Sequence, residues 1–292
     1  MEFTASFADA PLIEELLVGQ GWSPAVERPA RSRAPVLFSL YAAEGDREGA
    51  ELRARLQACF AEWNQWLSAA VSEFSCRRVR RQDWAESWKL HFKPLRIGRR
   101  LIVKPSWSEV DLQGGEQVVE LDPGMSFGTG QHGTTRACLE FVEQLSRRLE
   151  PGASFLDVGC GSGILSLAAA ALGFCPVVAF DYDETSSRVA RENVGRSPYA
   201  DAIRVETADL RKYPLSPRYR VVAANLLAPI IIRNAARLHD LLDVRSGAAY
   251  LLVSGILDEQ YGEAAIRMRE LGLREEQNRL LEGWRSGCFV LE

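Results

Sequence analysis

The run Asp157-Val158-Gly159-Cys160-Gly161-Ser162-Gly163 constrains this chain more than any other feature. It follows the apolar residues 153–156, which are typical of a buried strand, and precedes residues 164–170, which are typical of a helix. Glycines at alternate positions let the backbone turn sharply and approach a ligand with no Cβ in the way. A second apolar strand ends in Asp181, and a carboxylate about 20 residues past such a loop can accept hydrogen bonds from ribose hydroxyls. These features predict a site for a nucleotide-like cofactor.

Two other ligand-binding loops do not fit this spacing. A dinucleotide fingerprint, G-x-G-x-x-G, counted from Gly159 puts Ile164 where its last glycine should stand. A Walker loop needs Gly-Lys-Ser or Gly-Lys-Thr, and neither occurs near this loop. The remaining form, D-x-G-x-G-x-G, resembles the cofactor loop of class I S-adenosylmethionine-dependent methyltransferases. A glycine-rich turn without a ligand is the alternative.

Composition places the chain among ordinary globular proteins. With 292 residues, 47% hydrophobic and 25% charged, it suits one large or two modest domains. The net charge of −4 indicates that the chain as a whole is not a polyanion-binding protein. Six scattered cysteines without a C-x-x-C pair, and only three histidines, predict no metal site and reduced thiols. We find no signal peptide or membrane span in the pattern, and expect a cytoplasmic protein.

Residues 1–80 are predicted to form a small α+β domain. The expected elements are strands at 3–7, 25–28, 36–41 and 74–79 and helices at 12–18 and 49–67. Their β-α-β-β-α-β order is that of a ferredoxin-like domain. Residues 81–95 are predicted to be a linker, in which Trp84 and Trp88 would share one face of a helix and could pack against a neighbouring domain.

Residues 96–292 are predicted to form a Rossmann-like α/β domain. Strands are expected at 96–107 and 117–122, followed by a helix at 135–149. Strands then alternate with helical segments; the expected strands are 155–158, 177–181, 203–206, 221–224, 249–254, 274–279 and 287–291. This alternation predicts a parallel sheet with helices on both faces, and ligands bind beyond the carboxyl ends of such strands.

A second glycine-rich segment, residues 122–135, precedes the helix at 135–149. Its glycine amides can face a ligand, and Thr134 or Thr135 could cap the helix. A helix N-terminus offers N–H donors and a partial positive charge, which suit the methionine carboxylate of the cofactor. The alternative is a loop that only leads into a capped helix.

The pattern D-P-G-x-x-F-G-T-G-x-H-x-T-T at 122–135, ahead of D-x-G-C-G-S-G-I-L at 157–165, resembles the PrmA family, methyltransferases of large-subunit ribosomal protein L11. The resemblance extends over residues 83–257, through Asp83-Trp84 and Trp88, Pro105-Ser106-Trp107, Asn225-Leu226-Leu227-Ala228 and Ser254-Gly255-Ile256-Leu257. It implies cofactor contacts at Thr135, Gly159, Asp181 and Asn225, and a small N-terminal domain that recruits the ribosomal protein. Gln131 and Gly133 depart from the family, which often has Thr and Pro there.

Asn225, at the end of a predicted strand, is the predicted catalytic residue. Methyltransferases that act on amide or base nitrogens often carry N-P-P-Y here, whereas this chain has Leu226, Leu227 and Ala228 after the asparagine. A planar base or amide would lose its stacking partner, but a flexible lysine amine needs none. The alternative is that Asn225 only completes a turn at the end of the strand.

The predicted reaction is direct in-line methyl transfer to a neutral lysine amine. Because the unperturbed lysine pKa is near 10.4, the amine must lose its proton first, and a poorly solvated pocket would lower that pKa. Asn225 would orient the amine, and most of the rate gain would come from positioning. No general base is assigned, and His132 is interpreted as an orienting group rather than a base.

The predicted cofactor-binding residues are Phe127, Thr129, Thr134, Thr135, Asp157, Gly159, Gly161, Gly163, Asp181, Asp209 and Asn225. Asp209 is included because related folds contact adenine after the third strand, although it could equally be a structural turn acid. The predicted function is S-adenosylmethionine-dependent methylation of lysine amines of ribosomal protein L11, with its N-terminal amine as a second candidate. We expect no stable nucleic-acid partner and no membrane, and interpret the arginines at 77–81 as a solvated charge run. The alternatives are methylation of another protein's lysines, or a non-catalytic ribosome-binding module with a vestigial cofactor fold.

Overall fold

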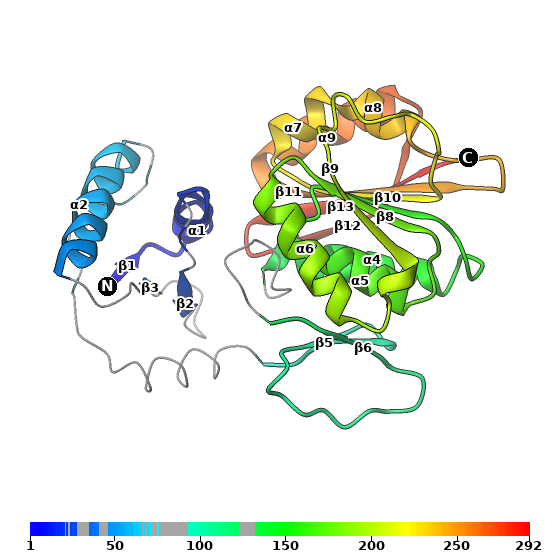
Figure 1. The fold of residues 1–292 in the computed structure, drawn as a ribbon. Helices are drawn as coiled ribbons and strands as arrows, with labels where there is room; N and C mark the ends of the chain where they lie inside the picture. The colour runs from blue at the N-terminus through cyan, green and yellow to red at the C-terminus, as the bar shows by residue number, and fades with distance from the viewer. Residues whose placement is uncertain are drawn as a thin grey trace. The chain divides into compact units, whose positions relative to one another are not determined.

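The computed structural model describes residues 1–20, 22, 24–27, 35–40, 46–65, 67, 69, 71, 75, 93–122 and 132–292. The chain divides into two compact units, Met1–His91 and Phe92–Glu292 (Figure 1). The arginines at 77–81, Trp84, Trp88 and most of the predicted linker 81–95 lie outside the described residues. The predicted domain limits therefore stay predictions.

The N-terminal unit contains a three-stranded sheet and two helices. In chain order these are β1 (Glu2–Ala5), α1 (Ala10–Gly19), β2 (Ala25–Glu27), β3 (Val36–Ser39) and α2 (Asp46–Trp63). The strands pair in the antiparallel order β1-β3-β2, and an isolated antiparallel bridge joins Glu2 to Ser75. This arrangement agrees with the predicted ferredoxin-like order, in which a last strand pairs with the first.

Aromatic packing forms the core of this unit. The Phe3 and Phe38 rings stack with centroids 5.1 Å apart, and Phe60 of α2 meets Phe3 edge to face at 4.8 Å. The prediction that this helix reaches residue 67 is wrong, because the chain turns at Asn64. The Asn64 amide pairs with the backbone of Val71, at 2.8 Å from its N–H and 3.0 Å from its carbonyl oxygen, so it replaces a further helical turn.

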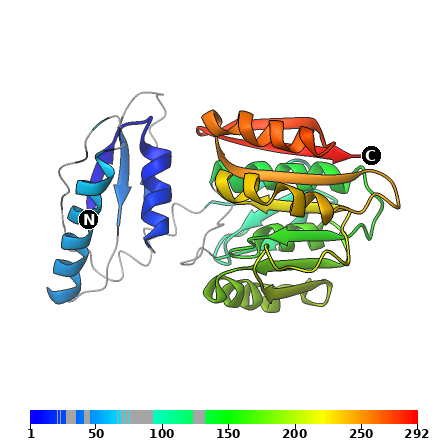
Figure 2. The ribbon, with the colours of Figure 1, turned by 90° about the horizontal axis from the view of Figure 1, so that it is seen from above.

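The second unit is built on a seven-stranded sheet in the order β12-β13-β11-β10-β7-β8-β9. Its strands are β7 (Phe155–Val158), β8 (Val177–Asp181), β9 (Ile203–Thr207), β10 (Val221–Asn225), β11 (Ala249–Leu257), β12 (Arg274–Leu281) and β13 (Trp284–Leu291). The helices α4 (Gly133–Ser146), α5 (Ile164–Ala171) and α6 (Glu184–Arg196) cover one face (Figure 1). The helices α7 (Ala228–Arg233), α8 (Ala235–Asp240) and α9 (Asp258–Glu270) cover the other (Figure 2). The predicted Rossmann-like architecture is confirmed.

The predicted all-parallel pairing is wrong at one strand. β13 runs antiparallel to both β11 and β12, whereas β7, β8, β9, β10 and β11 are parallel. A two-residue turn joins β12 to β13, and both its residues, Glu282 (φ 55°) and Gly283 (φ 85°), are left-handed. Such turns match the twist of a hairpin, so the last two strands form an antiparallel pair without a crossover helix.

A separate small sheet covers α4 and α5. It consists of β4 (Leu95–Ile97), β5 (Leu101–Lys104) and β6 (Gln117–Glu120), so the predicted single strand at 96–107 is wrong. The chain reverses at Gly98, whose φ is 57°. The buried Glu143 of α4 holds this turn, because its carboxylate accepts a hydrogen bond from the Arg99 N–H at 3.1 Å. A Cβ on Gly98 would lie 2.3 Å from that carboxylate, so a side chain there would displace it.

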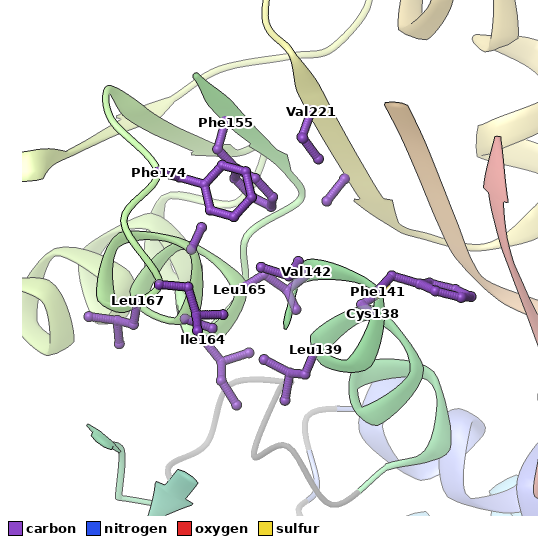
Figure 3. Close-up of a cluster of buried hydrophobic side chains, with 14 of the residues drawn as sticks. Cys138, Leu139, Phe141, Val142, Phe155, Ile164, Leu165, Leu167, Phe174 and Val221 are labelled. Atoms are coloured by element: carbon purple, nitrogen blue, oxygen red, sulfur yellow. The ribbon is translucent and has the colours of Figure 1, made fainter. Parts of the chain in front are cut away.

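The main apolar core lies between the sheet and the helices α4 and α5. Leu139 and Val142 of α4, Leu165 of α5, Phe155 of β7 and Phe174 belong to one cluster of buried apolar side chains (Figure 3). All of these side chains are almost completely buried. This packing holds α4 and α5 against one face of the sheet.

Candidate cofactor site at the carboxyl edge of the sheet

The glycine loop after β7 needs left-handed backbone at each of its glycines. The φ angles of Gly159, Gly161 and Gly163 are 73°, 53° and 80°. The Gly159 N–H donates to the Phe180 carbonyl of β8 at 2.8 Å, and the Gly163 N–H donates to the Cys160 carbonyl at 2.8 Å. A side chain at any of the three glycines would be strained in this conformation, which accounts for their alternate spacing.

Two of these glycines also lie against neighbouring side chains. A Cβ on Gly159 would stand 2.4 Å from Cδ2 of Leu226, and one on Gly163 would stand 3.3 Å from Cβ of Ala190. Leu226 directly follows β10, which neighbours β7 in the sheet. The side chain after the predicted catalytic asparagine therefore lies directly over the glycine loop.

Asp181, the predicted ribose acceptor, is tied to the same loop. At the end of β8, its Oδ2 accepts a hydrogen bond from the Gly161 N–H at 2.9 Å, and its Oδ1 accepts from the Asp183 N–H at 3.0 Å. Asp183 caps α6 instead, accepting from the N–H groups of Thr185 and Ser186. These backbone hydrogen bonds lower the pKa of Asp183. Two neighbouring acids thus have distinct environments, and only Asp181 meets the loop.

Asp157 supports the loop from beneath. It is 1% exposed, and its Oδ2 accepts hydrogen bonds from the Ser166 hydroxyl at 2.6 Å and the Ser166 N–H at 3.1 Å. Burial raises the pKa of Asp157 to about 7. The structure joins this predicted cofactor residue to α5 and leaves it almost no exposed surface.

The first turn of α4 meets the predicted catalytic residue. Nδ2 of Asn225 donates to Oγ1 of the buried Thr135 at 3.4 Å. The predicted cap, Thr134 or Thr135, is wrong: His132 is the N-cap, and its Nδ1 accepts from the Thr134 N–H at 3.4 Å. Nδ1 also lies 2.8 Å from Oγ1 of Thr134, and the His132 ring packs edge to face on Trp284 with centroids 5.5 Å apart. His132 thus holds the start of α4 in place, and its predicted role as an orienting group for the ligand stays a prediction.

Asp209 has a strong partner of its own. It follows β9, and both its carboxylate oxygens accept hydrogen bonds from the Arg211 guanidinium, at 2.7–3.0 Å. Arg211 holds the pKa of Asp209 at about 2, so the carboxylate is ionised over the physiological range. Asp209 therefore lies just after β9, the third strand of the predicted series, and its carboxylate is paired with the Arg211 guanidinium.

Several predicted residues form one continuous set of contacts. Thr135 meets Asn225, the next residue Leu226 covers Gly159, and Gly161 binds Asp181. They come from the ends of three adjacent strands, β10, β7 and β8, and from the start of α4. Phe127 and Thr129 lie outside the described residues.

Sequence reasoning missed one residue and one contact beside the glycine loop. Tyr182 directly follows Asp181 and is 75% exposed, which leaves an aromatic ring beside the predicted ribose acceptor. Its position after the strand-end acid was the available signal. The contact between Leu226 and Gly159 had no signal in the sequence, because it depends on which strand lies next to β7.

Other chemistries find little support in the part of the chain that the structure describes. There, no three His, Cys, Asp or Glu side chains group as a metal site, and no helix is long and apolar enough to cross a membrane. Burial raises the pKa of Cys138 and of Cys288 to about 12, so these thiols stay protonated. Neither is suited to act as a nucleophile.

The glycine loop after β7, the acid after β8 and the single reversed strand β13 beside β11 define the class I methyltransferase fold. The profile of the ribosomal protein L11 methyltransferase (PrmA) family matches residues 33–290, and the chain belongs to this family. Membership confirms the predicted resemblance and, with it, S-adenosylmethionine as the cofactor.

Individual relatives agree with this assignment. The chain is 42% identical over 205 residues to a ribosomal protein L11 methyltransferase of Geobacter sp. (strain M21), covering 69% of this chain but only 65% of that relative. It is 38% identical over 229 residues to the one of Pelotomaculum thermopropionicum, covering 77% of this chain and 72% of the relative. A crystal structure of a ribosomal protein L11 methylase from Lactobacillus delbrueckii subsp. bulgaricus shares the fold, with a TM-score of 0.58 at 24% identity, over 68% of this chain and 97% of that one.

Proposed function

We propose that this protein transfers the methyl group of S-adenosylmethionine to lysine side-chain amines of ribosomal protein L11, with the N-terminal amine of that protein as a second target. The observation that carries the proposal is the meeting of the glycine loop, Asp181 and Asn225 at one edge of the sheet. The names of the relatives support the choice of substrate. Such an activity belongs in the cytoplasm, where ribosomal proteins are made.

The residues at this edge fit the cofactor. The loop has no side chain at Gly159, where a Cβ would clash with Leu226, and Gly161, Gly163 and Asp157 shape or support the same turn. Asp181 would accept hydrogen bonds from the ribose hydroxyls. Asp209 would contact the adenine. The first turn of α4, with Thr134 and Thr135, would bind the methionine carboxylate through its N–H groups and partial positive charge; Phe127 and Thr129 would complete that end.

Asn225 would orient the acceptor. Bound S-adenosylmethionine supplies a methyl group activated by a positively charged sulfur. Since Nδ2 of Asn225 donates to Thr135, its Oδ1 is the end that can accept a hydrogen bond from an incoming amine. Such a hydrogen bond holds the neutral amine with its lone pair toward the methyl carbon, and the positioning accounts for most of the rate gain. The amine's proton leaves to water before attack.

The N-terminal unit, residues 1–80 in the predicted division, would recruit the ribosomal protein. Its helices pack on one face of the sheet, where Phe3 and Phe38 are buried. Thr4, which alternates with Phe3 along β1, is exposed on the opposite face. That face gives the unit a surface for a protein partner. A chain without the N-terminal unit would keep the cofactor site and would no longer bind the ribosomal protein.

The test is methylation of purified ribosomal protein L11 with isotope-labelled S-adenosylmethionine, read by mass spectrometry. We expect labelled lysines with the native enzyme and a loss of at least about 100-fold in turnover for Asn225→Ala. Asn234→Ala is the matched control, because the Asn234 amide donates only to the Ile230 carbonyl, at 2.8 Å, within a helix turn. The same labelling is repeated in a ribosome-free lysate. Label on another protein of that lysate, and none on L11, would overturn the substrate assignment.

A further inference from the structure

Three polar side chains lie in one row across adjacent strands at the carboxyl edge. Asn225 of β10 pairs with Ser254 of β11, and Oγ of Ser254 lies 2.6 Å from Oγ of Ser286 on β13. Ser254 and Ser286, here called the serine pair, are 0% and 1% exposed. Below them on the same strands lie the apolar Leu252 and the buried Cys288, which belong to the main core. The row is a polar layer on top of that core.

A β-bulge directs this row. The pairing of β11 with β13 shifts between Val253 and Ile256, so that Ser254 and Gly255 together oppose Ser286. Gly255 has a φ of 81°, and a Cβ there would stand 2.4 Å from the Leu226 carbonyl oxygen. Bulges of this kind re-aim a side chain and are common beside active sites. Here the bulge turns the Ser254 hydroxyl toward α4.

The row is bonded to the first turn of α4. Oγ of Ser254 donates to the Thr134 carbonyl at 3.1 Å, while Asn225 donates to Oγ1 of Thr135. Consecutive residues of the helix are therefore each held by a different strand. A hydroxyl carries one hydrogen, and Ser254 gives its hydrogen to a carbonyl that can only accept. With the Ser254 hydrogen on the Thr134 carbonyl, Ser286 is the donor between the two serines, although either oxygen has the geometry to donate.

The packing of the core does not require these hydroxyls. Alanine would occupy nearly the same space and bring no buried polar group to satisfy, whereas each buried hydroxyl costs free energy unless it is hydrogen-bonded. What the hydroxyls add is a fixed position for the α4 first turn relative to the sheet. That turn is the part of the helix that would bind the methionine carboxylate of the cofactor.

We propose that Ser254 and Ser286 are positioning residues for cofactor binding, which hold the first turn of α4 opposite the glycine loop. Ser254 acts on the helix directly and Ser286 acts through Ser254. The inference rests on the proposed function of this edge. Its consequence is a loss of cofactor affinity rather than of the chemical step, because the hydroxyls of the two serines bond to Thr134 and to each other and not to the Asn225 side chain.

The test compares full-length Ser254→Ala, Ser286→Ala and the double variant by calorimetric titration with S-adenosylhomocysteine and by steady-state kinetics. We expect about tenfold weaker binding for Ser254→Ala and about threefold for Ser286→Ala. The double variant should match Ser254→Ala, since Ser286 acts through Ser254. The KM for S-adenosylmethionine should rise in proportion, with kcat at saturating cofactor close to native.

Ser146→Ala is the matched control, because Oγ of Ser146 donates to the Glu143 carbonyl at 2.8 Å at the other end of the same helix. It should lower the melting temperature and leave cofactor affinity unchanged. Native affinity in a folded Ser254→Ala protein would overturn the proposal. If Ser254→Ala does not fold, Ser286→Ala is used instead, and native affinity for S-adenosylhomocysteine in that variant would also overturn the proposal. Failure of the native protein to bind S-adenosylhomocysteine would instead refute the proposed function.

Discussion

Gly159→Ala separates the two reasons for a glycine in the cofactor loop. The backbone at Gly159 is left-handed, with φ of 73°, and the new Cβ would stand 2.4 Å from Cδ2 of Leu226. Gly173 is a matched control, because its φ is 96° but nothing lies within 4 Å of a Cβ built there. Gly173→Ala therefore measures the backbone strain alone.

The magnitudes follow from these contacts. A left-handed alanine costs roughly 1–2 kcal/mol, and both variants carry this cost. In Gly159→Ala, Leu226 must also retreat by about 1 Å to reach an ordinary carbon contact. The backbone of Leu226 cannot shift, since its N–H donates to the Ser254 carbonyl oxygen and its own carbonyl oxygen lies against Gly255. The side chain must therefore rotate, at a further cost of about 0.5–1.5 kcal/mol.

Urea unfolding and calorimetric titration with S-adenosylhomocysteine give the two readouts. We expect Gly159→Ala to be less stable than Gly173→Ala by the rotation cost, and to bind the cofactor product at least about tenfold more weakly. Gly173→Ala should bind it normally. The double variant Gly159→Ala/Leu226→Ala should be less stable than Leu226→Ala by the backbone strain alone, because the clash with Leu226 has been removed. Equal stability of the two single variants, together with native affinity in Gly159→Ala, would refute the reasoning.

Three further predictions concern the acids and the N-terminal unit. Asp181→Ala should weaken binding of S-adenosylhomocysteine by about tenfold or more, because it removes a charged hydrogen-bond acceptor, and an unchanged calorimetric affinity would exclude the ribose assignment. The pKa of Asp157 is about 7 in the folded protein against an ordinary 3.8, so the folded state keeps a proton that the unfolded chain has lost. The free energy of unfolding should therefore fall as pH rises from about 4 to 7. Asp157→Asn, which keeps an acceptor for Ser166, should flatten this pH dependence in urea titrations. The same pH dependence in both proteins would contradict the assignment. A chain without residues 1–80 should still bind S-adenosylhomocysteine but should not methylate ribosomal protein L11, and retained turnover would place substrate recognition elsewhere.

The parts of the fold that the sequence predicted best are those with local causes. β7 and β8 begin and end at the predicted residues, because each is a short apolar run bounded by a glycine loop or an acid. The break at Gly98 was missed because the residues on both sides of it suit strands, and only the position of Glu143 on α4 shows why the chain turns there.

The parts of the site that were missed depend on strands far apart in the sequence. Asp181 could be assigned from its distance to the glycine loop, since both belong to one βαβ unit. Ser254 and Ser286 come together only through the reversed strand β13 and the bulge in β11. The cap of α4 was misassigned to a threonine because serine and threonine are the usual caps, whereas His132 is held there by Trp284 of the same reversed strand.

The end of β12 and the turn after it bear on why this chain has glycine at position 133, where the family often has proline. Proline at the first residue of a helix normally suits the backbone. Here a Cβ on Gly133 would stand 3.0 Å from both Cβ and the carbonyl oxygen of Leu281, and 3.4 Å from a carboxylate oxygen of Glu282. The end of the β12–β13 hairpin is therefore in tight contact with the place of the first side-chain atom of a proline. Glycine thus fits this position without any movement of the hairpin, whereas a side chain on the first residue of α4 would press the hairpin away from the helix that would bind the cofactor by a few tenths of an ångström.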